Sequence, residues 1–114
     1  MGIAAGDLRH RVALDRPTVV QDPVTGYLTE GWEEVAQVWG KIAASSARER
    51  IAAQAADSTV TGRIVIRYRP DVDATWRVRE LATGKVFAIE GVIPDPDSRR
   101  EWLTLPYSQG ASDG

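Results

Sequence analysis

Residues 63–69 have the sequence Arg-Ile-Val-Ile-Arg-Tyr-Arg, in which apolar and charged side chains alternate. This period of two is typical of a β-strand that buries one face, because successive side chains point to opposite sides of a sheet. The face expected to meet the core carries Ile64, Ile66 and Tyr68. The opposite face carries Arg63, Val65, Arg67 and Arg69. Pro70 and Asp71 end the strand.

A similar strand is predicted near the start of the chain. Residues 9–15 alternate, with His10, Val12 and Leu14 on the face expected to be buried. Pro17 breaks this pattern, so the strand is expected to end before it.

A turn and a second long strand follow. Residues 21–26 form the turn, in which Asp22 can bond back to the backbone and Gly26 can adopt positive φ. Residues 32–42 are rich in β-branched and aromatic side chains, which favours a strand. We expect this strand to bend at Gly40.

The second half of the chain repeats the strand and turn pattern. Strands are predicted at residues 76–79, 86–92 and 101–105, with turns at 83–85 and 94–97. These segments predict a mainly β fold, a small antiparallel β-barrel or sandwich of about six strands with one short helical insertion. A single domain is expected over residues 1–106, followed by a flexible C-terminal tail at 107–114.

The helical insertion is predicted at residues 45–58. Ser46 and Glu49 have the spacing of a capping box, and residues 51–56 are mostly alanine and other good helix formers. A short helix is marginal in water unless one side packs on a neighbour, and alanine provides little apolar surface for that. We therefore expect residues 45–58 to project from the body of the domain, where they could contact a neighbouring ring or line a channel.

Composition narrows the classes of function. The chain has 114 residues, a net charge of −2 and no cysteine, so disulfides and thiol chemistry are excluded, and bulk electrostatic coating of nucleic acid is disfavoured. The longest apolar run is residues 86–89, so no membrane segment is expected. The chain has twelve arginines but only two lysines, and four of its eight aromatic residues are tryptophans. Arginine and tryptophan are enriched where proteins meet.

No catalytic, cofactor or metal site is predicted. His10, the single histidine, shares its face with core residues, and no nucleophile elbow or phosphate-binding loop occurs. The pairs Asp71/Asp73 and Asp95/Asp97 lie beside prolines, as expected of solvated turns rather than cation sites.

Three pairs of arginines are the strongest positional feature. Arg9/Arg11, Arg67/Arg69 and Arg77/Arg79 are each spaced by two, so each pair projects from one side of its strand. They fit a solvated outer face balanced by Asp15, Glu80 and Glu90, an interface with an acidic neighbouring subunit, or a nucleic-acid surface.

Taken in order, several short segments resemble a known family. They are Ala5-Gly6-Asp7-Leu8-Arg9-His10-Arg11-Val12, Asp22-x-x-Thr25-Gly26, Trp32, Val38-Trp39-Gly40-Lys41-Ile42, Arg48-Glu49, Ile66-Arg67-Tyr68-Arg69, Trp76-Arg77-Val78, Phe87-Ala88-Ile89-Glu90-Gly91-Val92 and Leu103-Thr104-Leu105. The set resembles the head-tail joining (head-closure or stopper) proteins of long-tailed bacteriophages, which gene transfer agents and defective prophages also carry. Two departures are Gly40, where alanine is more usual, and the lack of a cysteine after the last strand.

The resemblance implies a structural protein of the virion neck, without catalysis or cofactor. It implies a homo-oligomeric ring below the portal and its adaptor that retains packaged DNA and offers a surface to the tail terminator or tail tube. Assembly in the host cytoplasm is expected, with no membrane partner and at most non-specific contact with DNA.

The expected interface residues come from the arginine pairs and the insertion. They are Arg9, Arg11, Ser46, Arg48, Glu49, Arg50, Ile51, Arg67, Arg69, Arg77 and Arg79. The alternative is an OB-like module that binds single-stranded nucleic acid, and a small hydrolase is a third class.

Overall fold

Seven strands and one helix form the chain in the computed structural model, which describes residues 8–57, 59–94 and 101–109. In chain order they are β1 (His10–Gln21), β2 (Leu28–Ala44), α1 (Ala47–Ala55), β3 (Gly62–Arg67), β4 (Arg77–Glu80), β5 (Val86–Ile89), β6 (Ile93–Pro94) and β7 (Trp102–Gln109). The two-residue β6 accounts for the one strand beyond the predicted set.

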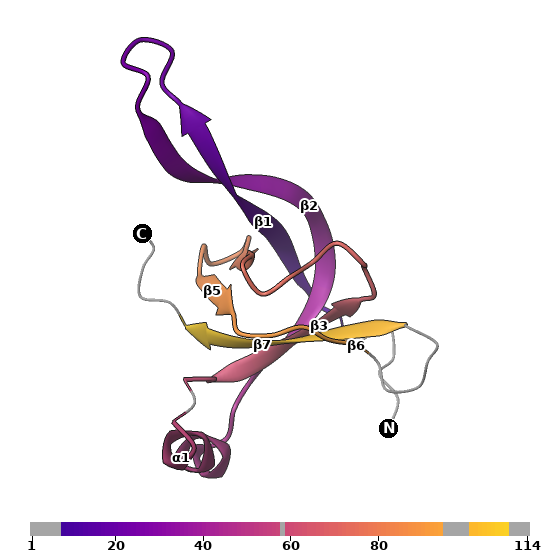
Figure 1. Cartoon of the computed structure of the whole chain (residues 1–114). Helices are drawn as coiled ribbons and strands as arrows, with labels where there is room; N and C mark the ends of the chain where they lie inside the picture. Colours follow the sequence, from indigo (N-terminus) through magenta and orange to yellow (C-terminus); the bar gives the residue numbers. More distant parts are fainter. Residues whose placement is uncertain (1–7, 58, 95–100, 110–114) are drawn as a thin grey trace.

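The strands make one antiparallel sheet that closes on itself. Its order is β3-β2-β1-β4-β5-β7-β6, and the additional pairing of β3 with β7 completes the closure (Figure 1). The predicted class, a mainly β antiparallel fold with one short helical insertion, is confirmed. Closure also removes most of the free strand edges that would otherwise invite aggregation.

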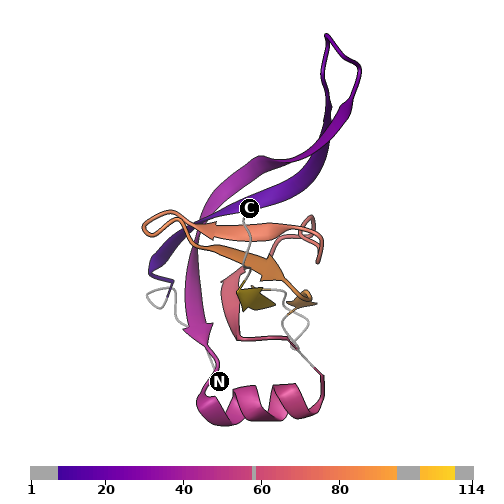
Figure 2. The ribbon, with the colours of Figure 1, turned by 90° about the vertical axis from the view of Figure 1, so that its left-hand side faces the viewer.

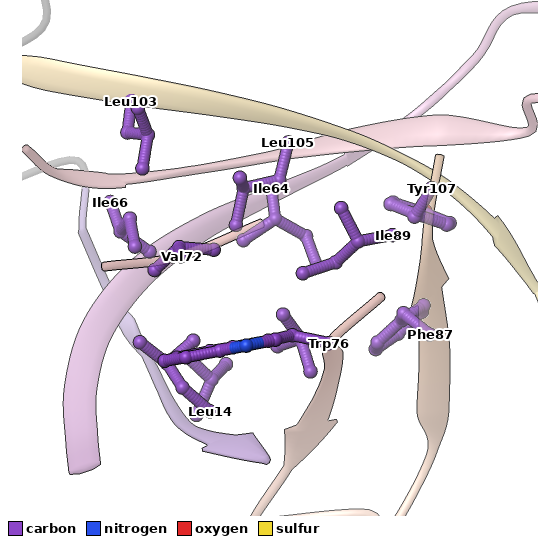
Figure 3. Packing of buried hydrophobic residues seen from close by; sticks show 12 residues of the cluster. Leu14, Ile64, Ile66, Val72, Trp76, Phe87, Ile89, Leu103, Leu105 and Tyr107 are labelled. Carbon is purple, nitrogen blue, oxygen red and sulfur yellow. The ribbon is translucent and has the colours of Figure 1, made fainter. Parts of the chain in front are cut away.

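The core fills the inside of this closed sheet (Figure 3). It consists of Val12, Leu14, Ile64, Ile66, Val72, Trp76, Val78, Phe87, Ile89, Leu103, Leu105 and Tyr107. The rings of Phe87 and Tyr107 meet edge to face, with centroids 4.6 Å apart. The predicted inward parity of Ile64 and Ile66 is therefore correct. Burial of each large aliphatic side chain stabilises the fold by about 1.5–3 kcal/mol.

Burial departs from strict alternation on two strands. Val65, expected on the outer face, is buried, and residues 12–15 are all buried, including Ala13 and Asp15. On their own face Val65 lies between Lys41 and Thr104, and Ala13 lies between Gln37 and Arg79. Long neighbouring side chains can cover small or medium ones, so polar outer faces also bury some residues.

The first two strands are longer than predicted and extend as a hairpin beyond the body. Pro17 does not end β1 but pairs with Trp32 of β2. Within the described residues β1 has β4 as a second neighbour only over Val12–Asp15, and a proline beyond that point lies on an edge strand, where it is tolerated. We call residues 16–33 the arm (Figures 1 and 2).

A β-bulge lies where the arm leaves the body. Leu14 pairs with Ala36 and Asp15 pairs with Glu34, so Val35 has no cross-strand partner in β1. A bulge increases the local twist and bends the strand. The predicted turn at the tip is correct: Gly26 has φ 77°, and the Asp22 carboxylate accepts hydrogen bonds from the backbone of Val24 and Thr25.

Several predicted boundaries in the second half were wrong. The segment 86–92 is a strand only to Ile89, and Pro94, expected in a turn, belongs to β6. The last strand does not end at Leu105: β7 continues to Gln109, because Tyr107 pairs with both Gly62 and Ile89 and is buried. Residues 107–109 are therefore not part of a flexible tail, and residues 95–97 and 110–114 of the predicted turn and tail lie outside the described residues.

The predicted helix is present and stands clear of the sheet (Figure 2). Ser46 and Glu49 make both hydrogen bonds of the capping box, with lengths of 2.8 and 3.2 Å. None of the α1 residues, all of which the structure describes, is buried. The insertion is closed at its base by a hydrogen bond from the amide of Ser45 to the carbonyl oxygen of Thr61.

Candidate functional site

Trp39 lies on the outer surface of β2, directly across from Arg11 of β1. The indole is 52% exposed, and the guanidinium carbon of Arg11 lies 5.2 Å from its ring centroid. This distance is that of a cation–π contact. Exposed tryptophan and arginine side chains are the types that contribute most to protein interfaces.

A groove of about 420 Å³ runs beside this pair, and we call it the basic groove. It is lined by Leu8, Arg11, Gln37, Val38, Trp39, Arg67, Tyr68 and Arg69. β2 lies between β1 and β3, with Gly40 paired to His10 on one side and to Ile66 on the other. This register brings the predicted arginines of two distant segments to either side of Trp39.

The arginines of β3 and the residues after it have different local partners. The guanidinium carbon of Arg67 lies 5.1 Å from the ring centroid of Trp102. Arg69 donates two hydrogen bonds, of 3.0 and 2.9 Å, to the carboxylate of Asp71. These bonds raise the pKa of Arg69 and lower that of Asp71. Because β3 ends at Arg67, Arg69 does not extend the strand face on which it was predicted.

Arg77 and Arg79 of β4 bind a buried carboxylate instead. Asp15 is 1% exposed, and its oxygens accept hydrogen bonds of 2.8 Å from Arg77 and of 3.1 and 3.2 Å from Arg79. Burial raises the pKa of Asp15, but the hydrogen bonds from Arg79 and Arg77 outweigh burial, and the pKa lies below its usual 3.8. A buried carboxylate held by two guanidinium groups is a fixed structural element.

This cluster holds the base of the arm. Arg79 also binds Glu34, at 3.0 Å, and the guanidinium carbon of Arg77 lies 4.5 Å from the ring centroid of Trp32. Both arginines are therefore engaged inside the molecule, with side chains only 20% and 30% exposed. An interface built from all three arginine pairs would need them on one free surface, whereas the β4 pair is bound by Asp15. Asp15 does balance arginines, whereas Glu80 lies near His10 and Glu90 accepts a hydrogen bond from Ser108.

The remaining predicted interface residues do not line the basic groove. Arg9 is exposed just before β1. Ser46 and Glu49 are used in the capping box, whereas Arg48, Arg50 and Ile51 are exposed on α1. The structure thus divides the predicted set into the basic groove, the Asp15 cluster and the helix, and Arg9 is exposed next to Leu8, which lines the groove.

One exposed surface was not predicted from the sequence, the apolar side of the arm. Cross-strand register puts six residues on one side of the hairpin, which we call the arm face: Pro17, Val19, Gln21, Leu28, Glu30 and Trp32. Val19 is 59% exposed, Leu28 70% and Trp32 44%. The sequence does contain a feature that could have indicated this surface. The apolar segments Val19-Val20 and Tyr27-Leu28 flank a short turn, and a hairpin this small cannot bury them.

Comparison with known proteins decides the family. Residues 3–110 match the model of a family described as phage head completion protein. The chain belongs to the phage head completion protein family. Its members are structural components of the virion, so this chain is a structural virion protein and not an enzyme.

Solved structures agree with this head completion protein fold. The solution structure of protein SF1141 from Shigella flexneri 2a is 30% identical, with a TM-score of 0.76 over 97% of this chain and 100% of that one. A chain in the virion of a native gene transfer agent particle is 24% identical, with a TM-score of 0.62 over 90% of this chain and 94% of that one. No curated protein matches the chain significantly.

The single histidine of the chain lies near an acidic side chain. Nε2 of His10 lies 3.9 Å from a carboxylate oxygen of Glu80. The described residues contain no group of three or more His, Asp or Glu side chains that could hold a metal ion. Within the same residues no helix is long and apolar enough to span a membrane.

Proposed function

We propose that this head completion protein forms a ring in the neck of a phage-like particle, where it joins the portal and its adaptor to the tail and helps retain DNA. The observation that carries the proposal is the projection of two exposed elements from opposite ends of the closed sheet, the arm and α1 (Figures 1 and 2). A ring subunit needs surfaces for its lateral neighbours and for a different protein on each side of the ring.

Helix α1 is the element proposed to contact a neighbouring ring or to line the channel. Its capping box gives it a defined start without help from the core, and Ile51 is 67% exposed. Arg48 and Arg50 are exposed on the same helix. Cationic side chains next to an exposed apolar one fit both a protein neighbour and non-specific contact with packaged DNA.

The proposed partners follow from this position in the neck. On the head side the ring would contact the portal or adaptor ring, and on the tail side the tail terminator or tail tube protein. The chain would reside in the virion neck and in the host cytoplasm during assembly.

Deletion of Ala47–Ala56 tests the proposal, because the hydrogen bond between Ser45 and Thr61 closes the insertion at its base. The shortened chain should remain folded and should fail to complete heads, as measured by nuclease sensitivity of packaged DNA and by tail attachment in electron micrographs. Ala53→Ser is the control that keeps the helix. A shortened chain that unfolds, or that completes heads as the full chain does, contradicts the proposal.

A second candidate function is binding of single-stranded nucleic acid. The specific observation in its favour is the basic groove, in which three arginines line the same surface as Trp39 and Tyr68. Arginines that follow a backbone and aromatic rings that stack on bases are the features such modules use. The net charge of −2 disfavours it.

A further inference from the structure

The arm face presents apolar side chains that the described residues of its own chain leave exposed. Val19 and Leu28 are each more than half exposed and lie on the same side of the hairpin as Trp32. Exposed apolar patches of this kind mark sites of protein contact. The hairpin is fixed in shape by twelve cross-strand pairs along β1 and β2 and by the Asp15 cluster at its base.

One unpaired charge lies within this apolar surface. Glu30 sits directly across from Val19, and within the described part of the chain no cationic group lies within ion-pair distance of its carboxylate. The glutamates near the base of the arm are paired: Glu33 is bound by Arg16 and Glu34 by Arg79. The arm face therefore combines an apolar stripe with one free negative charge.

The basic groove has the complementary composition. Leu8, Val38 and Trp39 give it apolar walls, and its lining, as far as the chain is described, contains no acidic residue. Arg69 is bound by Asp71. Arg11 and Arg67 lie over indole rings with no described carboxylate within ion-pair distance. The groove thus offers an exposed tryptophan and two cations for which the described residues provide no carboxylate partner.

The arm cannot reach the groove of its own chain. Arg11 and Gln21 are ten residues apart along the single strand β1, a separation of roughly 33 Å. The arm points away from the body in both views (Figures 1 and 2). An arm that fills the groove would therefore belong to another molecule.

We propose that the arm face of one copy of this chain docks in the basic groove of a second copy, with Val19 and Leu28 against Trp39 and Glu30 between Arg11 and Arg67. This contact joins two different surfaces, so each copy can bind one neighbour through its arm and another through its groove. If the rotation between successive copies adds up to a full turn, they form a closed ring, and otherwise they form an open chain of subunits. The inference rests on the proposed ring for its role in the particle. The docking itself is a property of the isolated chain and can be tested apart from that ring.

Two blocked variants of the full chain test the docking. Val19→Asp with Leu28→Asp blocks the arm face, and Trp39→Ala with Arg67→Glu blocks the groove. The altered side chains are exposed, so folding should be unaffected and is checked by circular dichroism. In sedimentation equilibrium up to ~1 mM, the range of a weak interface, the unaltered chain should form dimers and larger species. Each blocked variant alone should remain a monomer.

The decisive sample is an equimolar mixture of the two variants. It contains one intact arm face and one intact groove per pair, so it should form a dimer and nothing larger. The matched control is Val20→Asp, which lies on the opposite side of the hairpin at similar exposure (57%) and should associate like the unaltered chain within about twofold. A mixture that remains monomeric, or a blocked variant that associates alone, overturns the docking.

Particle assays separate this inference from the proposed function. Heads completed normally by both blocked variants, together with a monomeric mixture, remove the docking and leave the neck function intact. A dimer in the mixture, together with a chain that never enters particles, supports the docking and removes the neck function.

Discussion

The ring of Tyr107 on β7 lies across Gly62 on β3, its cross-strand partner. A Cβ atom at Gly62 would fall 2.5 Å from Cζ of Tyr107 and 2.6 Å from the carbonyl oxygen of Ala43. Glycine is therefore required where β3 and β7 close the sheet, because only a hydrogen atom fits beneath the ring. Tyr107 in turn reaches Phe87, so a single aromatic side chain connects β3, β5 and β7.

Gly62→Ala should lower the free energy of unfolding by about 1–3 kcal/mol, the usual effect of overpacking a filled site. The measurement is urea denaturation followed by tryptophan fluorescence. Gly91→Ala is the matched control, since a Cβ there meets nothing within 4 Å. Equal stability of the two variants would show that Tyr107 moves aside without loss.

Asp15→Ala should destabilise the chain by about 3–5 kcal/mol, because two arginines packed against the arm base lose their buried carboxylate. The same urea titration measures the loss. In the comparison variant Asp71→Ala, an exposed pair with Arg69 is removed, and the change should be at most about 1 kcal/mol. Similar losses in both variants would contradict a special role for Asp15.

The Asp15 cluster should also weaken in acid. The pKa of Asp15 is lower in the folded chain than the ordinary value of 3.8, so its contribution to stability is complete above that value and is lost as pH falls through the folded pKa. The stability difference between the unaltered chain and Asp15→Asn should therefore be constant at neutral pH and shrink below about pH 4. A difference that does not change down to pH 2.5 would contradict the lowered pKa.

Arg67→Glu combined with Arg69→Glu should leave the fold intact, since Arg67 is exposed and Arg69, 30% exposed, lies past the end of β3 and pairs with the exposed Asp71, and should prevent head completion. The isolated unaltered chain should bind fluorescent oligonucleotides barely at all in an anisotropy titration. Tight binding that falls steeply with salt and disappears in the double variant would favour the nucleic-acid function, because phosphate contacts release counterions.

At micromolar concentration the purified chain should be a monomer by light scattering. Each rim contact between arginine and carboxylate contributes only about 0–1 kcal/mol, so assembly should need a template or a high local concentration. A ring that persists without any other component would contradict this expectation.

Local sequence predicts the strands of this chain better than their contacts. The alternation of residues 63–69 gives the buried faces of Ile64 and Ile66 correctly, and the capping box at Ser46 gives the start of α1. The prediction that the first strand ends before Pro17 was wrong, because proline is excluded from central strands but tolerated in edge strands. No local sequence pattern shows that β1 becomes an edge strand beyond Asp15.

The basic groove and the Asp15 cluster depend on pairings between distant segments. Arg11 and Arg67 line the same groove because β2 lies between β1 and β3, and Arg77 binds Asp15 because β4 pairs with the first strand. Spacing within a segment shows which side of a strand an arginine takes. It does not show which strand lies beside it, and that neighbour decides whether the arginine is available at the surface or held by a carboxylate.

The pairing of β1 with β2 restricts how the length of the arm can change during evolution. Adding one residue to each strand would turn Val19 and Leu28 to the opposite side of the hairpin, because side chains alternate. Adding two residues to each strand would keep their orientation and lengthen the reach by ~7 Å. Homologous arms that keep these side chains on the same side should therefore differ in length by even increments per strand, so that the reach of the arm changes in discrete steps rather than over a continuous range.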